Sequence, residues 1–368
     1  MAHIPEMIAA EDTESHRITG EYQLQGPYPT ATCPPVASNP PHKGDENMTS
    51  APEFFDLAVI GSGIAGLAAA RAAQAAGLTC VVLDKGRRVG GRVSTRRADG
   101  FTFNHGAQFL TARSPAFVTA TTTALQAAAL VHWQVSGRDA LAGTPTMRDF
   151  PAFLQQGLTV RQQVEIRTIA HDDDGVCLRD SADQQVRARQ VIVTAPAPQA
   201  QKLLQDVAAS LATLAGTASY APCWTAMYGF DTAPPAHSTG PVGDADGPVG
   251  WALWEADRPG ADSANHALTV QASPQWSIDH LEDQADDVAY TLLAAWQDAS
   301  GQTIGTPRTM AAHRWRYARV INAASADAPV ISDCGRIGVA GDWLGGARIE
   351  HAFLSGEKAV AALVAADI

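Results

Sequence analysis

The chain has 368 residues, of which 46% are hydrophobic, and a formal net charge of -12 at pH 7. That length is typical of two domains, and the acidic balance argues against a nucleic acid partner, because phosphate binding requires a basic surface. No basic start with an apolar core opens the chain and no apolar run reaches membrane-spanning length, so we expect a cytoplasmic protein without a membrane segment. The cysteines show no CxxC or metal-ligand spacing, which predicts reduced thiols and no metal site. They are Cys33, Cys80, Cys177, Cys223 and Cys334.

Residues 1–53 are rich in Pro, Ser, Thr, Glu and Asp and show neither a helical nor a strand period. Such a segment cannot bury enough apolar surface to offset the entropy lost on ordering. We therefore expect a disordered N-terminal extension, with Met48 as an alternative start just ahead of the first strand.

A Rossmann-type βαβ unit is expected to begin at Phe54. The run FFDLAVIG is typical of a buried parallel strand, GIAGLAAARAAQAAG of a small-residue helix, and TCVVLD of a second buried strand. Between the first strand and the helix, Gly61, Gly63 and Gly66 form a GxGxxG motif, which permits a tight turn, the approach of a pyrophosphate and close helix packing. The helix N-terminus offers free N–H groups and a positive dipole end to phosphates, so the unit predicts a dinucleotide site.

The residues after this unit indicate which dinucleotide is bound. Asp84 ends the second strand, where its carboxylate can accept hydrogen bonds from the adenosine ribose hydroxyls. A second glycine turn, Gly90-Gly91-Arg92, then carries a guanidinium. Arginine binds phosphate oxygens in a planar fork, so this turn suits a pyrophosphate held from its other side and favours FAD over NAD.

The middle of the chain contains two kinds of sequence. VRQQVEIRTIAHDDDGVCLRDSADQQVRARQVIVTAP alternates like a β-meander, with a hairpin turn at Asp172–Gly175. Residues 106–157 and 201–312 instead hold six of the eight tryptophans, each singly more typical of a core but together indicating an apolar pocket. These six are Trp133, Trp224, Trp251, Trp254, Trp276 and Trp296.

The C-terminal sequence GRIGVAGDWLGGARIEHAFLSGEKAVAALVAA predicts a strand, a glycine-rich turn and a long helix. The carboxylate of Asp342, after Gly341, can bond the hydroxyls of a ribityl chain, and a turn at Gly345-Gly346 opens a helix whose N–H groups can face the flavin. We expect an α/β protein with a Rossmann-type FAD-binding domain and a discontinuous α+β cap. The FAD-binding domain is predicted to comprise residues 54–105, 158–200 and 313–368, and the cap residues 106–157 and 201–312.

These motifs resemble the FAD-dependent amine oxidase superfamily and, within it, the renalase-like branch, from about Phe55 to the C-terminus. The GxGxxG, Asp84 and GGR series is shared across the superfamily, whereas NHGAQFLTAR, TAPAPQAQKLL, SPQWS, HRWRYARV and AGDWLGGARIEHAFLSG indicate the branch. The resemblance implies that Val164 contacts the adenine through its backbone and that Ile349 lies under the isoalloxazine ring. The residues expected to contact non-covalent FAD are Gly61, Gly63, Ile64, Ala65, Gly66, Asp84, Lys85, Gly91, Arg92, Gln108, Phe109, Val164, Ala195, Gly341, Asp342, Gly346, Arg348 and Ile349.

The resemblance further implies an oxidase that takes hydride from a dihydronicotinamide, the 2- or 6-dihydro isomers of NAD(P), to flavin N5 and passes the electrons to O2, releasing H2O2. A dihydropyridine that loses hydride becomes an aromatic pyridinium, so no strong base is required, and no Ser-His-Asp or paired-carboxylate constellation is evident. Candidate residues are Gln108 and Phe109 beside the flavin, Trp251 and Gln271 in the cap, and Arg258 for the substrate phosphates.

Two departures from the family pattern concern the substrate. Gln271 stands where the family has a histidine before its SPQWS segment, and the family's aspartate before its GAQ segment corresponds to Asn104 or His105. The alternative is therefore a flavin amine oxidase or desaturase acting on another small organic substrate. A flavin-binding sensor without turnover is a third hypothesis.

Overall fold

The computed structural model describes residues 53–232, 247–325 and 330–366, all within one compact unit. The disordered extension predicted for residues 1–53 lies outside the described residues, apart from its last residue.

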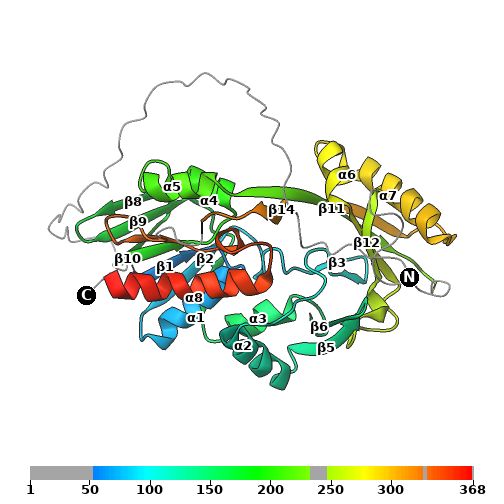
Figure 1. Cartoon of the computed structure of the whole chain (residues 1–368), viewed down its shortest axis with the longest axis horizontal. Coiled ribbons are helices and arrows are strands. Elements are labelled where there is room, and N and C mark those ends of the chain that lie inside the picture. The colour runs from blue at the N-terminus through cyan, green and yellow to red at the C-terminus, as the bar shows by residue number, and fades with distance from the viewer. Residues whose placement is uncertain (1–52, 233–246, 326–329, 367–368) are drawn as a thin grey trace, which may run out of the picture. The chain divides into compact units, whose positions relative to one another are not determined.

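A seven-stranded sheet carries the predicted βαβ unit (Figure 1). In spatial order its strands are β7 (Thr159–Gln162), β2 (Cys80–Asp84), β1 (Phe54–Ile60), β10 (Gln185–Val193), β9 (Gly175–Asp180) and β8 (Ile166–Asp172), and β15 (Ile337–Val339) also pairs with β10. β7, β2, β1, β10 and β15 are parallel, as expected for strands that are apolar on both faces. β8 and β9 form the predicted hairpin, in which Asp172 pairs with Gly175.

Helices cover both faces of this sheet (Figure 1). α1 (Ile64–Ala75) and α8 (Ile349–Ala366) pack on one face, and α4 (Ala197–Leu204) and α5 (Ala209–Gly216) on the other. The predicted strands, hairpin and C-terminal helix are confirmed, and with them the α/β fold class.

The close packing of α1 against α8 depends on Gly356. A Cβ at this position would lie 2.2 Å from the carbonyl oxygen of Ala65 and 2.9 Å from the amide nitrogen of Ala69. We therefore expect Gly356→Ala to lower the free energy of unfolding by about 1–3 kcal/mol, because both helices must move apart. Denaturant unfolding measures the change. Gly305→Ala is the control, since its Cβ would meet nothing within 4 Å, and equal stability of the two variants would contradict the packing argument.

A second sheet lies beside the first and has four antiparallel strands. Its order is β12 (Val249–Trp254), β13 (Ala267–Ala272), β11 (Ser219–Gly229) and β14 (Thr309–Asn322). α6 (Pro274–Asp279) and α7 (Ala285–Ser300) cover one of its faces, where Trp254 and Trp296 form part of the core rather than of a pocket. The domain division remains a prediction, and its boundary at residue 313 falls inside β14.

The remaining elements connect the two sheets. They are β3 (Arg96–Ala98) paired with β4 (Phe101–Phe103), β5 (Leu130–Val135) paired with β6 (Arg138–Gly143), α2 (Pro115–Gln126), α3 (Asp149–Gln155), and the short 3-10 helices η1 (Glu255–Asp257) and η2 (Asp342–Leu344).

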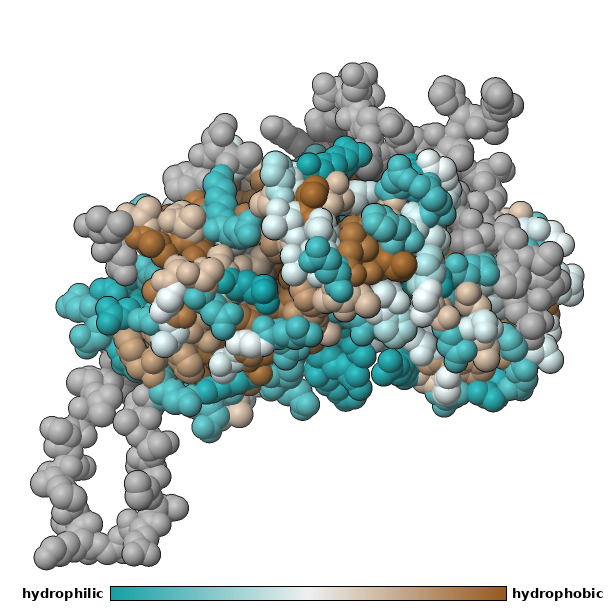
Figure 2. Space-filling view, turned by 90° about the horizontal axis from the view of Figure 1, so that it is seen from below, coloured by the Kyte–Doolittle hydropathy of each residue, from teal (hydrophilic) through white to brown (hydrophobic). Residues whose placement is uncertain are grey.

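Figure 2 shows one face of the molecule, on which hydrophobic and hydrophilic residues alternate in small groups. The most exposed large hydrophobic residues of the described chain come from six different elements, so no single element presents an apolar face. They are Phe54, Val118, Ile278, Tyr290, Ile321 and Val364. Within the described ranges, no helix has both the length and the apolarity needed to cross a membrane.

Candidate functional site

The GxGxxG turn has the geometry that a dinucleotide requires. A Cβ on Gly66 would lie 1.9 Å from the carbonyl oxygen of Gly61, so the helix can approach the strand this closely only because residue 66 is glycine. Gly61 also has a φ of +109°, which other residues rarely adopt. A Cβ on Gly63 would meet nothing within 4 Å, which leaves space over the loop for a ligand.

The start of α1 is suited to phosphate groups. No side chain caps the helix at Gly63 and no acidic residue lies in its first turn, so the N–H groups of Ile64 and Ala65 are not engaged by a helix cap. The second glycine turn lies directly beside it, because the Gly90 N–H donates to the Ser62 carbonyl at 2.9 Å and a Cβ on Gly91 would be 3.5 Å from the Gly63 Cα. The two glycine turns thus lie side by side, and a pyrophosphate held by both of them stays a prediction.

Asp84 lies at the end of β2, beside this loop. Its carboxylate accepts hydrogen bonds from the backbone N–H of Ser62, from the Ser62 hydroxyl at 2.8 Å, and from the Gly86 N–H at 2.6 Å. Ser62 was not predicted as a site residue, although its place inside the motif was a signal. The Val164 N–H donates to the Asp84 carbonyl at 2.9 Å, which leaves the Val164 carbonyl for the predicted adenine contact.

Arg92 and Asp342 join the second glycine turn to the C-terminal motif. The guanidinium donates to both carboxylate oxygens, at 2.7 and 2.6 Å, and Asp342 is buried. Burial lowers the pKa of Arg92, but the charge and hydrogen bonds of Asp342 raise it by more, so Arg92 stays protonated. We predicted separate roles for these residues on the pyrophosphate and the ribityl chain. The structure joins them in one bidentate ion pair next to the glycine turns.

Other predicted cofactor residues lie at the edges of these elements. Ile349 begins α8 and packs against an apolar cluster of α1, α2 and α3, and Arg348 before it lies 3.9 Å from the carboxylate of Glu350.

Four further predicted cofactor residues take part in hydrogen bonds within the protein. The Ala195 carbonyl accepts a hydrogen bond from the Trp343 indole, and the exposed Lys85 donates to Gln199. Gly346 accepts a hydrogen bond from the ring of His351, and Gly341 donates to the Ser355 hydroxyl.

The structure brings four of the five predicted substrate-site residues together around Gly106. Gln108 is buried and donates to the Gly106 carbonyl at 3.0 Å, and Gln271 on β13 donates to the same oxygen at 2.7 Å. The rings of Phe109 and Trp251 contact each other with centroids 5.8 Å apart, and the buried Trp251 indole nitrogen has no hydrogen-bond partner within the described chain. A buried donor without a partner thus lies near two amides that already donate to the Gly106 carbonyl.

Arg258 is not available to a substrate phosphate, so our prediction for it was wrong. Its side chain is 0% exposed and lies 3.6 Å from Glu255, over the Trp133 ring. Its guanidinium donates to the Gln108 backbone carbonyl at 2.5 Å and to the side-chain oxygen of Gln108 at 3.1 Å. Arg258 therefore holds Gln108 in place from inside the protein.

Sequence reasoning missed an aromatic cluster on the face of the second sheet that also carries Gln271. His313 and Trp315 are two residues apart on β14, so their side chains share a face, and both contact the ring of His105. Burial, the neighbouring His313 and the charge of Arg96 together lower the pKa of His105 to about 3, so this imidazole is neutral at pH 7. Strand alternation within HRWRYARV was the available signal.

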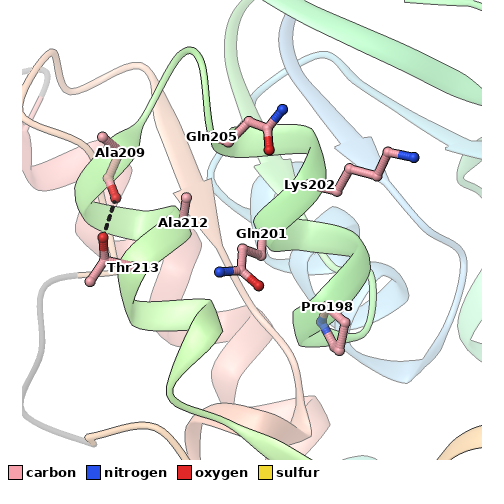
Figure 3. Close-up of a pocket in the computed structure, with 7 residues that line it drawn as sticks. All are labelled: Pro198, Gln201, Lys202, Gln205, Ala209, Ala212 and Thr213. Carbon is pink, nitrogen blue, oxygen red and sulfur yellow. Dashed lines mark hydrogen bonds between the residues drawn. The ribbon is translucent and has the colours of Figure 1, made fainter. Parts of the chain in front are cut away.

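Two cavities lie away from these residues. One, of about 340 Å³, lies between α4 and α5 and is shown in Figure 3. The other, of about 530 Å³, lies between the start of β11 and α6 and reaches Tyr220, whose ring faces the Arg92 guanidinium at 5.8 Å. Neither is lined by a residue that we predicted to bind cofactor or substrate.

Comparison with known proteins agrees with this architecture. The model of an NAD(P)-binding Rossmann-like domain matches residues 59–119, and that of the flavin containing amine oxidoreductases matches residues 123–364. Among curated proteins, a 4,4'-diapophytoene desaturase of Staphylococcus haemolyticus is 46% identical over 50 residues, which span 14% of this chain and 10% of the desaturase.

Solved structures share the fold at low sequence identity. Putrescine oxidase has a TM-score of 0.66 and 16% identity, covering 85% of this chain and 99% of its own. Cyclohexylamine oxidase from Brevibacterium oxydans has a TM-score of 0.63 and 14% identity, covering 84% of this chain and 99% of its own. A protein described as a putative protoporphyrinogen oxidase, from an Exiguobacterium species, has a TM-score of 0.64 and 16% identity, covering 83% of this chain and 97% of its own.

Proposed function

Because the chain belongs to the family of flavin-containing amine oxidoreductases, we propose that it is an FAD-dependent oxidase of the renalase-like branch. Its substrate in this proposal is a 2- or 6-dihydronicotinamide nucleotide, and its products are the pyridinium and H2O2. The observation that carries the proposal is the neutral character of the face around Gly106. Two amides, an indole, a phenyl ring and the neutral imidazole of His105 contribute to it.

This set of groups suits hydride loss better than proton abstraction. Bound FAD would accept the hydride and pass two electrons to O2, which takes up two protons to leave as H2O2. A dihydronicotinamide gains aromaticity when it loses hydride, so the protein has to position it and exclude water rather than supply a base. Gln108 and Gln271 hold the Gly106 backbone in place, and the contact between Phe109 and Trp251 provides an apolar wall.

We propose that FAD is held non-covalently by the residues of the two glycine turns, Asp84 and the C-terminal motif. A covalent link through cysteine would need a thiol within the C-terminal motif. Of the four described cysteines, Cys334 is nearest in sequence to Asp342, but it is exposed and lies before β15, beside the Ser332 hydroxyl. The space over Gly63 and the uncapped start of α1 support the phosphate part of this assignment.

A flavin amine oxidase or desaturase acting on another small organic substrate is the second candidate, because the similar proteins include putrescine and cyclohexylamine oxidases and a desaturase. Gln271 is one of the two departures from the renalase-like pattern and donates to the Gly106 carbonyl, so a change of donor would be expected there.

Anaerobic rapid mixing of the oxidised holoprotein with a panel of donors separates the two candidates. We expect 2- or 6-dihydronicotinamide nucleotides to bleach the flavin quickly, and O2 to restore its absorbance with release of H2O2. Ordinary 4-dihydro NADH should react slowly, because its transferable hydride sits at another ring carbon and small misplacements are costly to rate. Fast bleaching by a primary amine, with none by any dihydronicotinamide isomer, would decide for the amine oxidase function.

A further inference from the structure

A row of four side chains crosses the second sheet at the candidate site. Trp251 of β12 pairs with Gln271 of β13, which pairs in turn with Thr225 of β11. Thr225 also pairs with His313 of β14. Side chains of directly opposed residues on antiparallel strands project from the same face of the sheet. The row therefore presents its side chains to one side, with Gln271 between Trp251 and Thr225.

The loop after β4 is fixed over this row by three contacts. The Gln271 side-chain amide donates to the Gly106 carbonyl at 2.7 Å, and the Trp315 indole donates to the His105 carbonyl at 2.8 Å. The rings of His105 and His313 contact each other with centroids 5.2 Å apart. These contacts hold the loop backbone against Gln271 and give its amide one position.

The contact with Gly106 also sets which way round the Gln271 amide lies. A carbonyl oxygen only accepts hydrogen bonds, so the amide nitrogen faces Gly106 and uses one of its two N–H groups there. The Gln271 Oε1 forms no hydrogen bond within the described chain, and it is not among the buried atoms that lack a partner. Gln271 is itself partly exposed. Its amide therefore has an accessible acceptor and a second N–H that can bind a ligand.

Aromatic rings flank this amide and are incompletely buried. On one side, the rings of Phe109 and Trp251 have centroids 5.8 Å apart, and on the other those of His313 and Trp315 have centroids 4.3 Å apart. All four residues are partly exposed. Apolar rings around a few placed polar groups are the usual lining of a small-molecule site. The surroundings of Gln271 thus suit a flat ring that carries a polar substituent.

A primary carboxamide is the substituent that complements Gln271, because it places N–H donors beside a carbonyl acceptor. The nicotinamide ring carries one such group. We propose that Gln271 binds the carboxamide of the dihydronicotinamide substrate and so determines how the ring lies against the flavin. Its Oε1 accepts from the substrate N–H, and its second N–H donates to the substrate carbonyl.

This inference rests on the proposed function and makes Gln271 a specificity-determining residue. The shared chemistry is an edge that offers N–H beside C=O. The pyrimidine ring of FAD has such an edge too, so the experiment distinguishes the substrate from the cofactor.

The test compares a 2- or 6-dihydronicotinamide mononucleotide with its 3-acetyl analogue, in which a methyl group replaces the amide nitrogen. Anaerobic flavin reduction gives the half-saturating concentration of each. The wild-type holoprotein should need about tenfold less of the carboxamide donor, because the acetyl group cannot donate a hydrogen bond. Gln271→Leu should raise the half-saturating concentration of the carboxamide donor about tenfold and that of the acetyl donor much less.

The ratio of variant to wild type is compared for each donor, so that intrinsic differences in hydride transfer cancel. Gln275→Leu is the matched control and should behave as wild type. It removes an exposed glutamine whose amide donates to Asp279 on α6.

Three outcomes would overturn the inference. Equal half-saturation of the wild type by the two donors would do so without any variant, even if Gln271→Leu does not fold. An equal loss for both donors in Gln271→Leu would mean that Gln271 acts only by holding Gly106. Weaker FAD binding or a shifted flavin absorbance in the variant would assign the amide to the cofactor. A wild-type protein that no dihydronicotinamide reduces would refute the proposed function itself, and that result is distinct from the other three.

Discussion

Replacing Glu255 by alanine should lower the free energy of unfolding by about 3–5 kcal/mol, because it leaves the buried charge of Arg258 without its partner. Glu255 is 1% exposed, and one of its carboxylate oxygens accepts hydrogen bonds from the Asn104 backbone N–H at 2.7 Å and from the Thr269 hydroxyl at 2.6 Å. The other oxygen accepts the Asn104 side-chain amide at 2.7 Å. One substitution therefore leaves three donors without an acceptor and the guanidinium without its counter-charge.

Thermal and denaturant unfolding measure this change, and flavin content measures its effect on the site. Glu282→Ala is the control, because it removes an exposed carboxylate that pairs with Arg314 and Arg316 and should change stability little. A double variant, Glu255→Leu with Arg258→Met, should recover part of the lost stability, since it removes both charges together. Equal stability of Glu255→Ala and Glu282→Ala would refute the buried network.

The local parts of the fold could be predicted because neighbouring residues determine them. The strand ending at Ile60, the glycine turn and the helix beginning at Ile64 follow from apolar runs and from two glycines, Gly61 and Gly66, where a Cβ would clash. The hairpin at Asp172–Gly175 follows in the same way from alternation and turn residues. In each case the residues that specify the element lie within the element.

Interactions between distant segments could not be predicted in this way. Arg92 and Asp342 each had a recognisable motif, but nothing in either motif says that they pair with each other. Arg258 could be recognised as a cation in the cap, yet its burial depends on Glu255 and on Gln108, which belongs to a different part of the chain. A motif identifies the chemistry of a residue, whereas burial decides whether a ligand can reach it.

Asn104 illustrates how a departure from a family pattern can be explained by packing. Its amide nitrogen donates to Glu255, and its side-chain oxygen accepts hydrogen bonds from the Thr95 hydroxyl at 2.7 Å and the Met147 N–H at 2.8 Å. An aspartate here would face the Glu255 carboxylate without a donor and with like charge. The substitution therefore fits the buried network beside the site and need not change the reaction.

Asp84→Ala should weaken FAD binding by about ten- to a hundredfold, the range expected when hydrogen bonds to a charged group are lost. The carboxylate lies at the end of β2 beside the glycine turn, where it would accept bonds from the adenosine ribose. Titration of the apoprotein with FAD, followed by flavin fluorescence, measures the affinity. FMN has no adenosine, so its affinity should change much less.

The same substitution also removes the bonds from Ser62 and Gly86, so the loop itself has to be controlled for. Asp56→Ala is matched, because the Asp56 carboxylate likewise accepts a backbone N–H and a hydroxyl, both from Thr79, at 2.8 and 2.6 Å. Asp56 lies near the start of β1, at the opposite end of the parallel strands from Asp84, so its loss should leave FAD affinity unchanged. If Asp84→Ala weakens FAD and FMN binding equally, Asp84 acts only by shaping the loop. If it weakens FAD binding alone, the carboxylate binds the adenosine half of the cofactor.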